Sequence, residues 1–263
     1  MARPVIALLS DFGTGNHYAG TMKGVVLGIC PDVTLVDVSH DLPPHDVLAG
    51  ALELAASYRY FPPATVFLVV VDPGVGSGRR GLAAEAGDYR FVAPDNGVLT
   101  AVFAESGPKA VVELTERQYA RPTVSRTFEG RDRFAPAAAW LAKGVRLGAL
   151  GRPVDDYRRL DIPAPRLDEG AVAGEVLLVD RFGNLISNVD RRTFDRLTPG
   201  ATLEIQVDGR PVPYLVSTYG DIPAGAVGAL FGGSERLEVA ANAASAAERL
   251  GVGRGARIEI RRR

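Results

Sequence analysis

An acidic residue, a glycine-rich turn and two arginines follow one another at residues 72–80 and could form a catalytic loop. The apolar, β-branched run at 65–71 predicts a buried strand, which would fix the position of Asp72. Glycines in the turn let a ligand approach the backbone closely, because they carry no Cβ. Arg79 can fold back to pair with the Asp72 carboxylate. The alternative is a tight surface turn with solvated charges.

A second acid, Asp11, follows the apolar run 5–9 and stands beside Gly13 and Gly15. A carboxylate at a strand end can accept hydrogen bonds from ribose hydroxyls. Capping of the helix that follows explains the same residue equally well. The segment lacks the third glycine of the dinucleotide fingerprint, so it gives little support to a nicotinamide site.

Four charged residues at 129–133 stand beside a predicted helix start and include Glu129. A solvated helix cap explains Asp132. Phe128 and Phe134 flank the charges, and this pattern favours a partly buried polar pocket.

An acid, an aromatic ring and an amide interrupt an apolar run at Asp180, Phe182 and Asn184. A plain hairpin turn is one interpretation. The other is a carboxylate and an amide directed at a zwitterionic or heteroaromatic ligand.

The elements that position these residues alternate between strand and helix as far as residue 143. Strands are predicted at 5–9, 33–38, 65–71 and 110–114, a hairpin at 82–86 and 90–93, and helices at 18–29, 46–60, 98–105 and 134–143. This alternation predicts an α/β domain, residues 1–162, with a mostly parallel sheet. Ligands collect at the carboxyl ends of such strands, where Asp11 and Asp72 stand.

The pattern changes after a proline-rich connector at 160–170. Short β-like runs follow at 173–179, 184–189, 202–207, 212–216, 226–231, 236–240 and 256–260, with one helix at 242–250. We therefore predict a smaller, mainly β domain over residues 172–263.

Composition excludes several classes of protein. The chain has 263 residues, 46% of them hydrophobic and 23% charged, with a formal net charge of −1, so no strong field favours nucleic acid or an anionic membrane. A single cysteine excludes an internal disulfide framework. The three histidines lack metal-site spacing, so no metal is expected. No serine-nucleophile elbow or phosphate-binding loop occurs. No apolar run reaches signal-peptide or membrane length, and we expect a cytoplasmic protein.

In their order, these segments resemble the S-adenosyl-L-methionine hydrolase (adenosine-forming) family. It is also called the SAM hydroxide adenosyltransferase family and is related to fluorinase and chlorinase. The resemblance covers nearly the whole chain and rests on residues 9–14 with Tyr18 and 22–24, 71–76 with Arg79, 93–97, 127–128 with 130–132, and Asp180 with 182–184.

The resemblance implies a Rossmann-like N-terminal α/β domain, a β-barrel-like C-terminal domain and a homotrimer. Its ligand would bind between the N-terminal domain of one subunit and the C-terminal domain of the next. The implied reaction is attack of water or hydroxide on the ribose C5′ of S-adenosyl-L-methionine, which gives adenosine and L-methionine without a metal or cofactor. Asp72 and Arg79 match the catalytic Asp and Arg of the family.

The sequence departs from the family at the catalytic histidine, where it has Glu129. A neutral imidazole accepts a proton near pH 7, whereas a free glutamate is a much weaker base. Glu129 could share a water and a proton with Asp72, Arg79 offsetting the repulsion between the carboxylates. Alternatively it pairs structurally with Arg79 or Arg131, and the protein binds S-adenosylmethionine or adenosine without turnover. His45 is a third candidate for the imidazole.

Halide use is disfavoured, because carboxylates near the nucleophile would repel an anion and the halogenase relatives carry an aromatic hydroxyl in place of Asp72. For substrate binding, the resemblance assigns Asp11 to the ribose diol and Asp180 to the methionine ammonium. It assigns the remaining contacts, to adenine and to the carboxylate, to Phe182, Asn184, Ser234 and Asn242; Asn96, in the matching segment 93–97, is expected to bind substrate as well.

Overall fold

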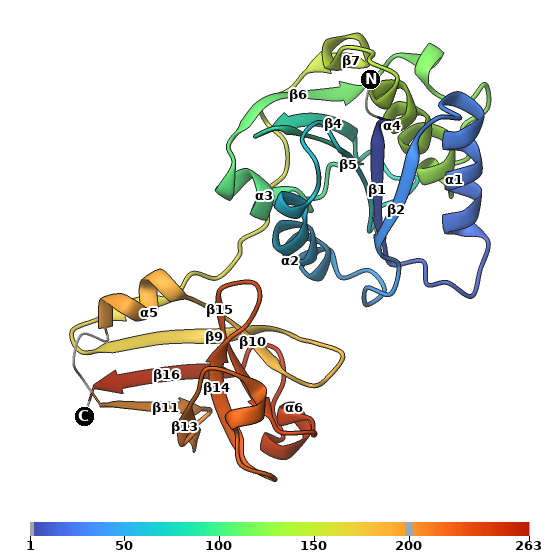
Figure 1. Ribbon diagram of the computed structural model, residues 1–263. Helices are drawn as coiled ribbons and strands as arrows, with labels where there is room; N and C mark the ends of the chain where they lie inside the picture. Colours follow the sequence, from blue (N-terminus) through green and yellow to red (C-terminus); the bar gives the residue numbers. More distant parts are fainter. Residues whose placement is uncertain (1–2, 198–201, 263) are drawn as a thin grey trace. The chain divides into compact units, whose positions relative to one another are not determined.

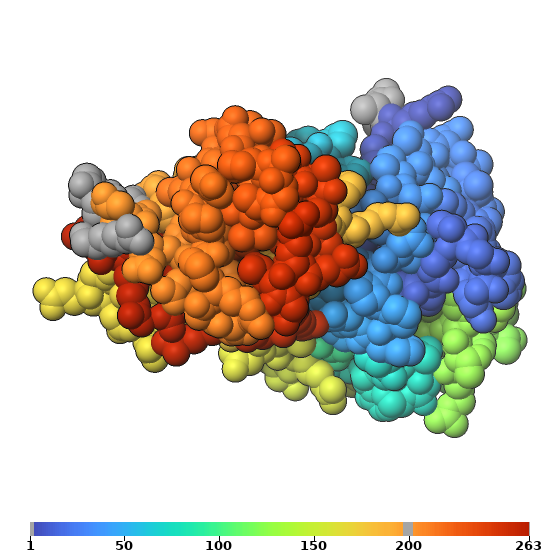
Figure 2. Space-filling view, turned by 90° about the horizontal axis from the view of Figure 1, so that it is seen from below, coloured from blue at the N-terminus to red at the C-terminus, as the bar shows by residue number. Residues whose placement is uncertain are grey.

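A computed structural model describes residues 3–197 and 202–262. The chain divides into two compact units, Met1–Asp161 and Ile162–Arg263, and each is described here by itself (Figure 1). Figure 2 shows the atoms of the chain as spheres, in the colours of Figure 1. Within the described residues, no helix combines the length and the hydropathy needed to cross a bilayer.

The first unit is built on a seven-stranded sheet with the order β2-β1-β3-β5-β4-β6-β7. Its strands are β1 (Val5–Ser10), β2 (Thr34–Ser39), β3 (Val66–Val70), β4 (Gly81–Ala86), β5 (Tyr89–Pro94), β6 (Pro108–Leu114) and β7 (Gly151–Pro153). The α/β class is confirmed.

The prediction of a mostly parallel sheet is wrong for half of the strand pairings. Strands β2, β1, β3 and β5 are parallel neighbours, whereas β4, β6 and β7 run antiparallel to theirs. The cause is the tight turn between β4 and β5, where Gly87 has φ +54°. Such a turn reverses the chain at once, while a parallel neighbour needs a crossover of a dozen residues or more.

Helices cover both faces of this sheet. The helices are α1 (Tyr18–Ile29), α2 (Val47–Ser57), α3 (Thr100–Glu105) and α4 (Ala135–Ala142), with 3₁₀ turns at Tyr58–Tyr60, Arg117–Tyr119 and Leu147–Ala149 and a π-helical turn at Gly130–Phe134. The α1 and α4 helices share a buried core with Ile6, Leu8 and Leu68. Gly50 of α2 packs against Val71, so α2 lies on the opposite face.

The second unit is a curled nine-stranded sheet with the order β12-β11-β16-β9-β10-β15-β14-β13, in which β8 also pairs with β9 (Figure 1). The bounds are β8 (Arg166–Asp168), β9 (Ala171–Val179), β10 (Leu185–Asp190), β11 (Leu203–Val207), β12 (Arg210–Pro211), β13 (Tyr214–Leu215), β14 (Val227–Phe231), β15 (Arg236–Ala241) and β16 (Arg257–Arg262). A core of aliphatic side chains, including Val172, Val239 and Ile258, fills its concave face, as expected for a β-barrel-like domain.

The helices of this unit differ from the sequence expectation. A helix that was not predicted, α5 (Arg191–Leu197), follows β10, and a 3₁₀ turn lies at Tyr219–Asp221. The helix predicted at 242–250 is only α6 (Ala246–Leu250). Ser245 explains the late start, because its side chain accepts a hydrogen bond from Glu248 N and caps the helix there.

Candidate active site

The loop 71–80 joins β3 to β4 and passes the carboxyl end of β5, the strand that lies between them. Two consecutive residues at the end of β5 hold it. Asn96 Nδ2 donates to the Val71 carbonyl (2.8 Å), and Asp95 Oδ2 pairs with Arg80 (2.7 Å). Both ends of the loop are therefore fixed to the same strand end. Asn96 Oδ1 accepts from Val98 N (3.1 Å), so both polar groups of this side chain are used within the protein.

Arg79 brings two carboxylates together inside this loop. Its Nε donates to Asp72 Oδ1 (2.9 Å) and its Nη2 to Asp72 Oδ2, while its Nη1 lies 2.6 Å from Glu129 Oε2. The side chains of Asp72, Arg79 and Glu129 are only 5%, 3% and 11% exposed. Burial lowers the pKa of Arg79, but the hydrogen bond and charge of Asp72, aided by Glu129, raise it overall. The arginine is a fixed cation between two anions.

Glu129 directly precedes the π-helical turn Gly130–Phe134. Its Oε2 is buried and, despite the nearby Arg79, has no donor aligned for a hydrogen bond. Its other oxygen lies 3.5 Å from Arg133 Nη1. Gly130 lets this turn approach α1, because a Cβ there would lie 3.1 Å from Met22 Sδ. Glu129 is therefore a buried carboxylate that lies between two cations, Arg79 and Arg133.

Gly76 determines the shape of the loop 71–80. It has φ +76°, a conformation in which glycine is favoured, and a Cβ would overlap the carbonyl oxygen of Arg126. Arg126 in turn donates to the Gly76 carbonyl (3.1 Å). This contact ties the loop to the segment that carries Glu129.

Asp11 stands at the same sheet edge as Asp72. Strands β1 and β3 are parallel neighbours with Ser10 opposite Val70, so the residues after them meet at one edge. Asp11 Oδ2 accepts from His45 N (2.8 Å); within the described part of the chain, Oδ1 has no donor. His45 therefore lies beside Asp11, its ring exposed.

Three aromatic rings that the sequence analysis did not combine lie next to Asp11. Phe12, Tyr18 and Phe128 contact one another with ring centroids 5.3–6.0 Å apart. Tyr18 is 40% exposed, so the cluster presents an apolar surface to solvent. The rings come from three separate segments, and only their tertiary packing brings them together.

In the second unit, Asp180 and Asn184 bind each other. Asp180 Oδ1 accepts from the backbone N of Phe182 (2.9 Å) and Asn184 (2.8 Å), and Oδ2 accepts from Asn184 Nδ2 (2.8 Å). This Asx turn explains the local bend. Phe182, at its tip, is 76% exposed, which leaves the ring face free to stack on a planar ligand.

The other two predicted binding residues flank opposite ends of β15. Ser234 is exposed in the turn before the strand, and Asn242 follows it and donates to the Ile222 carbonyl (2.8 Å). Antiparallel pairing of β10 with β15 places Asn184 near the Asn242 end. The structure thus brings Asp180, Asn184 and Asn242 to one end of the sheet and leaves Ser234 at the other.

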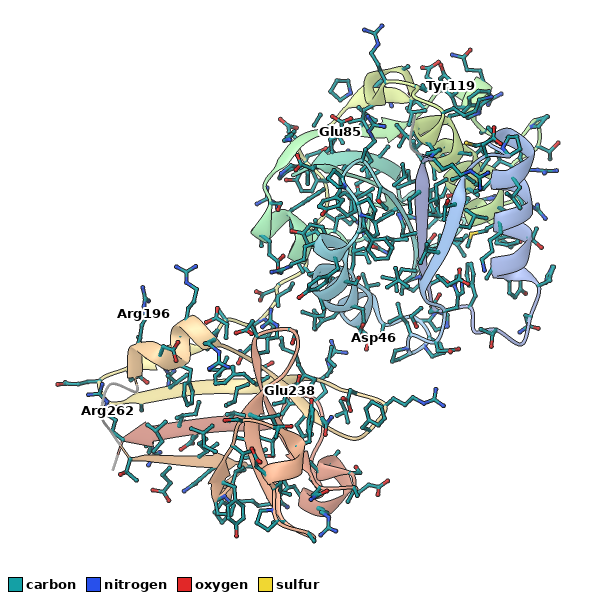
Figure 3. All side chains as sticks on the ribbon, viewed as in Figure 1. Asp46, Glu85, Tyr119, Arg196, Glu238 and Arg262 are labelled. Atoms are coloured by element: carbon teal, nitrogen blue, oxygen red, sulfur yellow. The ribbon has the colours of Figure 1, made fainter. Side chains whose placement is uncertain are left out.

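Sequence reasoning missed Glu238, a buried acid in the middle of β15 (labelled in Figure 3). Tyr219 donates to its Oε2 (2.7 Å), and a Cβ at Gly232 would overlap its Oε1. Burial and the charge of Asp180 raise the pKa of Glu238, while the Tyr219 hydrogen bond opposes this. One signal was available, since a single acid stands within the apolar run 237–241, but strand alternation places it on the face opposite Leu237 and Val239.

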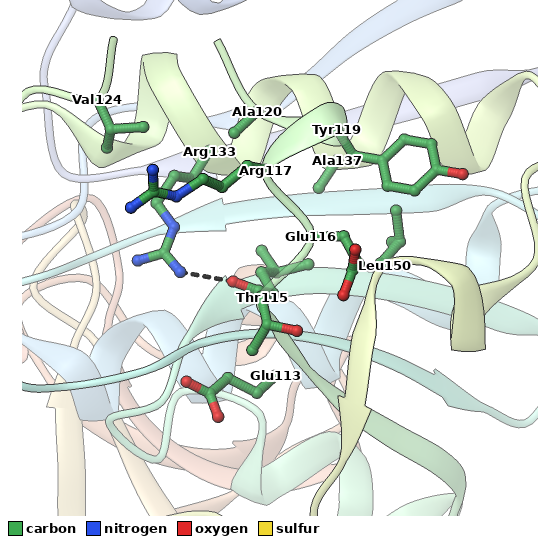
Figure 4. A pocket seen from close by; sticks show the side chains of 11 residues that line it. Glu113, Thr115, Glu116, Arg117, Tyr119, Ala120, Val124, Arg133, Ala137 and Leu150 are labelled. Atoms are coloured by element: carbon green, nitrogen blue, oxygen red, sulfur yellow. Dashed lines mark hydrogen bonds between the residues drawn. The ribbon is translucent and has the colours of Figure 1, made fainter. Parts of the chain in front are cut away.

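A cavity of about 360 Å³ lies in the first unit, where Leu114, Arg133 and Leu150 are among the residues that line it (Figure 4). None of the predicted site residues lines it. Arg133, which donates to the Leu114 carbonyl (2.6 Å) at its wall, also contacts Glu129. Among the described residues, no group of three or more His, Cys, Asp or Glu side chains is arranged to hold a metal ion.

Comparison with known proteins places this geometry in a family. The chain is 38% identical over 260 residues to an (R)-S-adenosyl-L-methionine hydrolase of Salinispora tropica, covering 98% of this chain and 97% of that protein. It is 40% identical over 268 residues to the enzyme of the same name from Thermus thermophilus, covering 98% and 99%. A crystal structure of an uncharacterized conserved protein from Thermotoga maritima superposes with a TM-score of 0.92 at 35% identity, covering 98% of this chain and 100% of that one.

Two family patterns match the sequence itself. The SAM hydroxide adenosyltransferase N-terminal domain matches residues 6–151, and the C-terminal domain of the same family matches residues 174–259. Both matched ranges contain predicted site residues. The chain therefore belongs to the SAM hydroxide adenosyltransferase family.

Proposed function

We propose that this protein is an enzyme that hydrolyses S-adenosyl-L-methionine to adenosine and L-methionine. Two relatives with the name (R)-S-adenosyl-L-methionine hydrolase match nearly the whole chain at 38% and 40% identity. The observation that carries the proposal is the position of Arg79, which binds Asp72 and lies 2.6 Å from the Glu129 carboxylate in a buried site. These carboxylates can hold and deprotonate a water molecule.

In the proposed reaction the oxygen of water attacks the ribose C5′ as the C5′–S bond breaks. The bonding electron pair goes to sulfur, and the sulfonium becomes the neutral thioether of methionine. The leaving group needs no proton, so a general acid is unnecessary. The water proton passes to a carboxylate, and Glu129 is the candidate acceptor because it stands where the family resemblance implies the catalytic histidine.

The fixed negative charge suits both the cationic substrate and a polarised water, and it disfavours a halide nucleophile. Arg79 orients the Asp72 carboxylate with two hydrogen bonds, and such positioning contributes to rate by holding the nucleophile in line. Asp11 is proposed to bind the ribose diol through its free Oδ1. Asp180, Phe182, Asn184, Ser234 and Asn242 are proposed to bind the methionine and adenine groups, with Asn96 acting on the loop and the substrate.

A homotrimer with sites at subunit interfaces is part of the proposal. The family resemblance supports it, as does the distribution of the proposed binding residues over two units. A cytoplasmic location is proposed as well, and the unpaired thiol of buried Cys30 suits a reducing compartment.

Hydrolysis in ¹⁸O-labelled water tests the reaction. Purified protein should convert S-adenosyl-L-methionine to equimolar adenosine and L-methionine, with the label in the adenosine O5′. Chloride and fluoride should give no 5′-halo-5′-deoxyadenosine. Product formation at the spontaneous rate would refute the proposal, and formation of homoserine with methylthioadenosine, or of methanol with S-adenosylhomocysteine, would show that a different C–S bond breaks.

A further inference from the structure

Residues 10–13, which carry Asp11, are held by a chain of hydrogen bonds that no proposed role above uses. Ser10 Oγ lies 2.7 Å from His40 Nδ1, His40 Nε2 lies 3.1 Å from Asp37 Oδ1, and Asp37 Oδ2 accepts from Lys23 (2.6 Å). Ser10 has no exposed surface, and His40 is 5% exposed. This series of hydrogen bonds runs from Ser10 at the end of β1, through His40 and Asp37 at the end of β2, to Lys23 in α1.

The direction of these hydrogen bonds follows from the chemistry of Asp37. Partial burial raises its pKa, but the hydrogen bonds from Lys23 and His40 lower it overall, so Asp37 is a carboxylate that can only accept. His40 Nε2 therefore donates to it. In the neutral ring Nδ1 is then the acceptor, and the Ser10 hydroxyl donates to Nδ1.

The order serine, histidine, aspartate is that of a hydrolytic triad. A serine nucleophile must reach the substrate, however, and Ser10 is completely buried. The arrangement is therefore suited to holding a backbone segment rather than to nucleophilic attack.

The segment it holds is the one that presents Asp11. Ser10 Oγ, oriented by His40, accepts from Phe12 N (3.4 Å). The His40 carbonyl accepts from Gly13 N (2.7 Å), and His45 N donates to Asp11 Oδ2 (2.8 Å). Residues 40–45 thus contact this segment at three points. One of them orients the Asp11 carboxylate directly and leaves its Oδ1 available.

We infer that His40 is a positioning residue that acts through Ser10 to hold Asp11 in its ligand-binding orientation. The role of Asp11 as the ribose acceptor rests on the proposed function. Loss of the Ser10–His40 hydrogen bond lets residues 11–13 move, so the affinity for the nucleoside falls. The chemistry at Asp72 and Glu129 is unchanged, because those residues belong to other loops.

The test compares conservative variants, with KM and kcat for S-adenosyl-L-methionine and the Kd of adenosine by calorimetry. Ser10→Ala and His40→Gln remove the Ser10–His40 hydrogen bond, and each should raise KM and Kd about fivefold at nearly constant kcat. His40→Asn places an amide oxygen where Nδ1 was and should retain most of the affinity. Ser57→Ala, which loses a hydroxyl bonded to helix carbonyls in α2, is the matched control.

Double variants separate positioning from mere stability. Ser10→Ala combined with His40→Gln should be no weaker than either alone, and Ser10→Ala should have no further effect in an Asp11→Asn background. Additive losses, or a lower melting temperature with unchanged adenosine affinity, would overturn the inference. The wild type could bind adenosine, and the variants could weaken that binding as expected, without any hydrolysis of S-adenosyl-L-methionine. In that case the proposed function fails while the inference stands. A wild type that does not bind adenosine overturns both.

Discussion

Arg79 binds both carboxylate oxygens of Asp72, through Nε to Oδ1 and through Nη2 to Oδ2. This two-point contact fixes the plane of the carboxylate as well as its position. The third nitrogen, Nη1, faces Glu129 at 2.6 Å. One side chain therefore sets the relative geometry of both acids.

Replacement of Arg79 by lysine tests this geometry. Lysine keeps the charge but cannot make the planar two-point contact. We expect kcat to fall about 100-fold, the scale of a small misplacement of catalytic groups. Arg59→Lys, at an exposed pair with Glu105, is the control and should retain full activity. An Arg79→Lys enzyme with normal kcat would contradict the positioning role.

Glu129→Gln and Glu129→His test the proton acceptor. Glutamine has nearly the shape of glutamate but cannot take the proton, so kcat should fall about 100-fold or more. Histidine restores the family's residue and should retain turnover above pH 7. Steady-state kinetics of the wild type, Glu129→Gln and Glu129→His show whether Glu129 accepts the proton. If the wild type shows no turnover and Glu129→His does, the natural protein binds its ligand without hydrolysing it.

Gly76→Ala should distort the loop 71–80. The added methyl group overlaps the Arg126 carbonyl, and the positive φ is unfavourable for alanine, at a cost of about 1–3 kcal/mol. Both kcat and the melting temperature should fall. Gly78→Ala is a matched control in the same loop, because a Cβ there meets nothing within 4 Å. Equal effects of the two variants would argue against a specific role for Gly76.

Phe182→Ala should raise KM for S-adenosyl-L-methionine about tenfold, since stacking of a base on an aromatic ring contributes about 1–3 kcal/mol. The melting temperature should not change, because the ring is 76% exposed. Tyr60→Ala removes a ring of similar exposure (73%) from the first unit and serves as the control. An unchanged KM would remove Phe182 from the binding site.

Glu238 should make the stability of the second unit depend on pH. Its pKa is raised in the folded state, so the stabilisation it gives is complete below the unfolded pKa of about 4.3 and is lost as pH rises through the folded value. Glu238→Gln does not titrate. The melting temperature of Glu238→Gln minus that of the wild type should therefore increase by several degrees between pH 4 and pH 8.

The solvent-facing turn acid Glu235, paired with Arg191, supplies the control for that experiment. Glu235→Gln should show a difference from wild type that varies little over the same pH range. If the melting-temperature difference between Glu238→Gln and the wild type also stays constant with pH, burial does not raise the pKa of Glu238 in the folded state.

The sequence was sufficient for the elements whose periodicity is strong. Strands such as β1 and β3 and the helix α1 lie within a residue or two of their predicted bounds, because apolar spacing reflects the face each one buries. The residues of the loop 71–80 could also be selected, since an acid and glycines directly follow a buried strand. Periodicity does not contain the order of strands in a sheet. The β4–β5 hairpin was predicted, but the antiparallel pairings of β6 with β4 and β7 were missed for that reason.

Long-range side-chain contacts were equally beyond the sequence. Nothing local indicates that His40 bonds to Ser10, thirty residues earlier, or that Tyr219 donates to Glu238. The same holds for Asn96, whose amide binds the Val71 carbonyl across the sheet. Such contacts depend on which strands become neighbours, and strand order is set by packing of the whole unit.

The attachment of the loop 71–80 to Asp95 and Asn96 has a consequence for how this active site can evolve. Both anchors lie outside the loop's apex, residues 73–78, so exchanges at apex positions without tertiary contacts, such as Gly78, should leave the Asp72–Arg79 pair undisturbed, whereas Gly76 is held by its contact with Arg126. Selection can therefore vary those contact-free positions at little risk to the reaction. A scaffold of this kind offers protein engineers a region for randomisation whose two supports are already rigid.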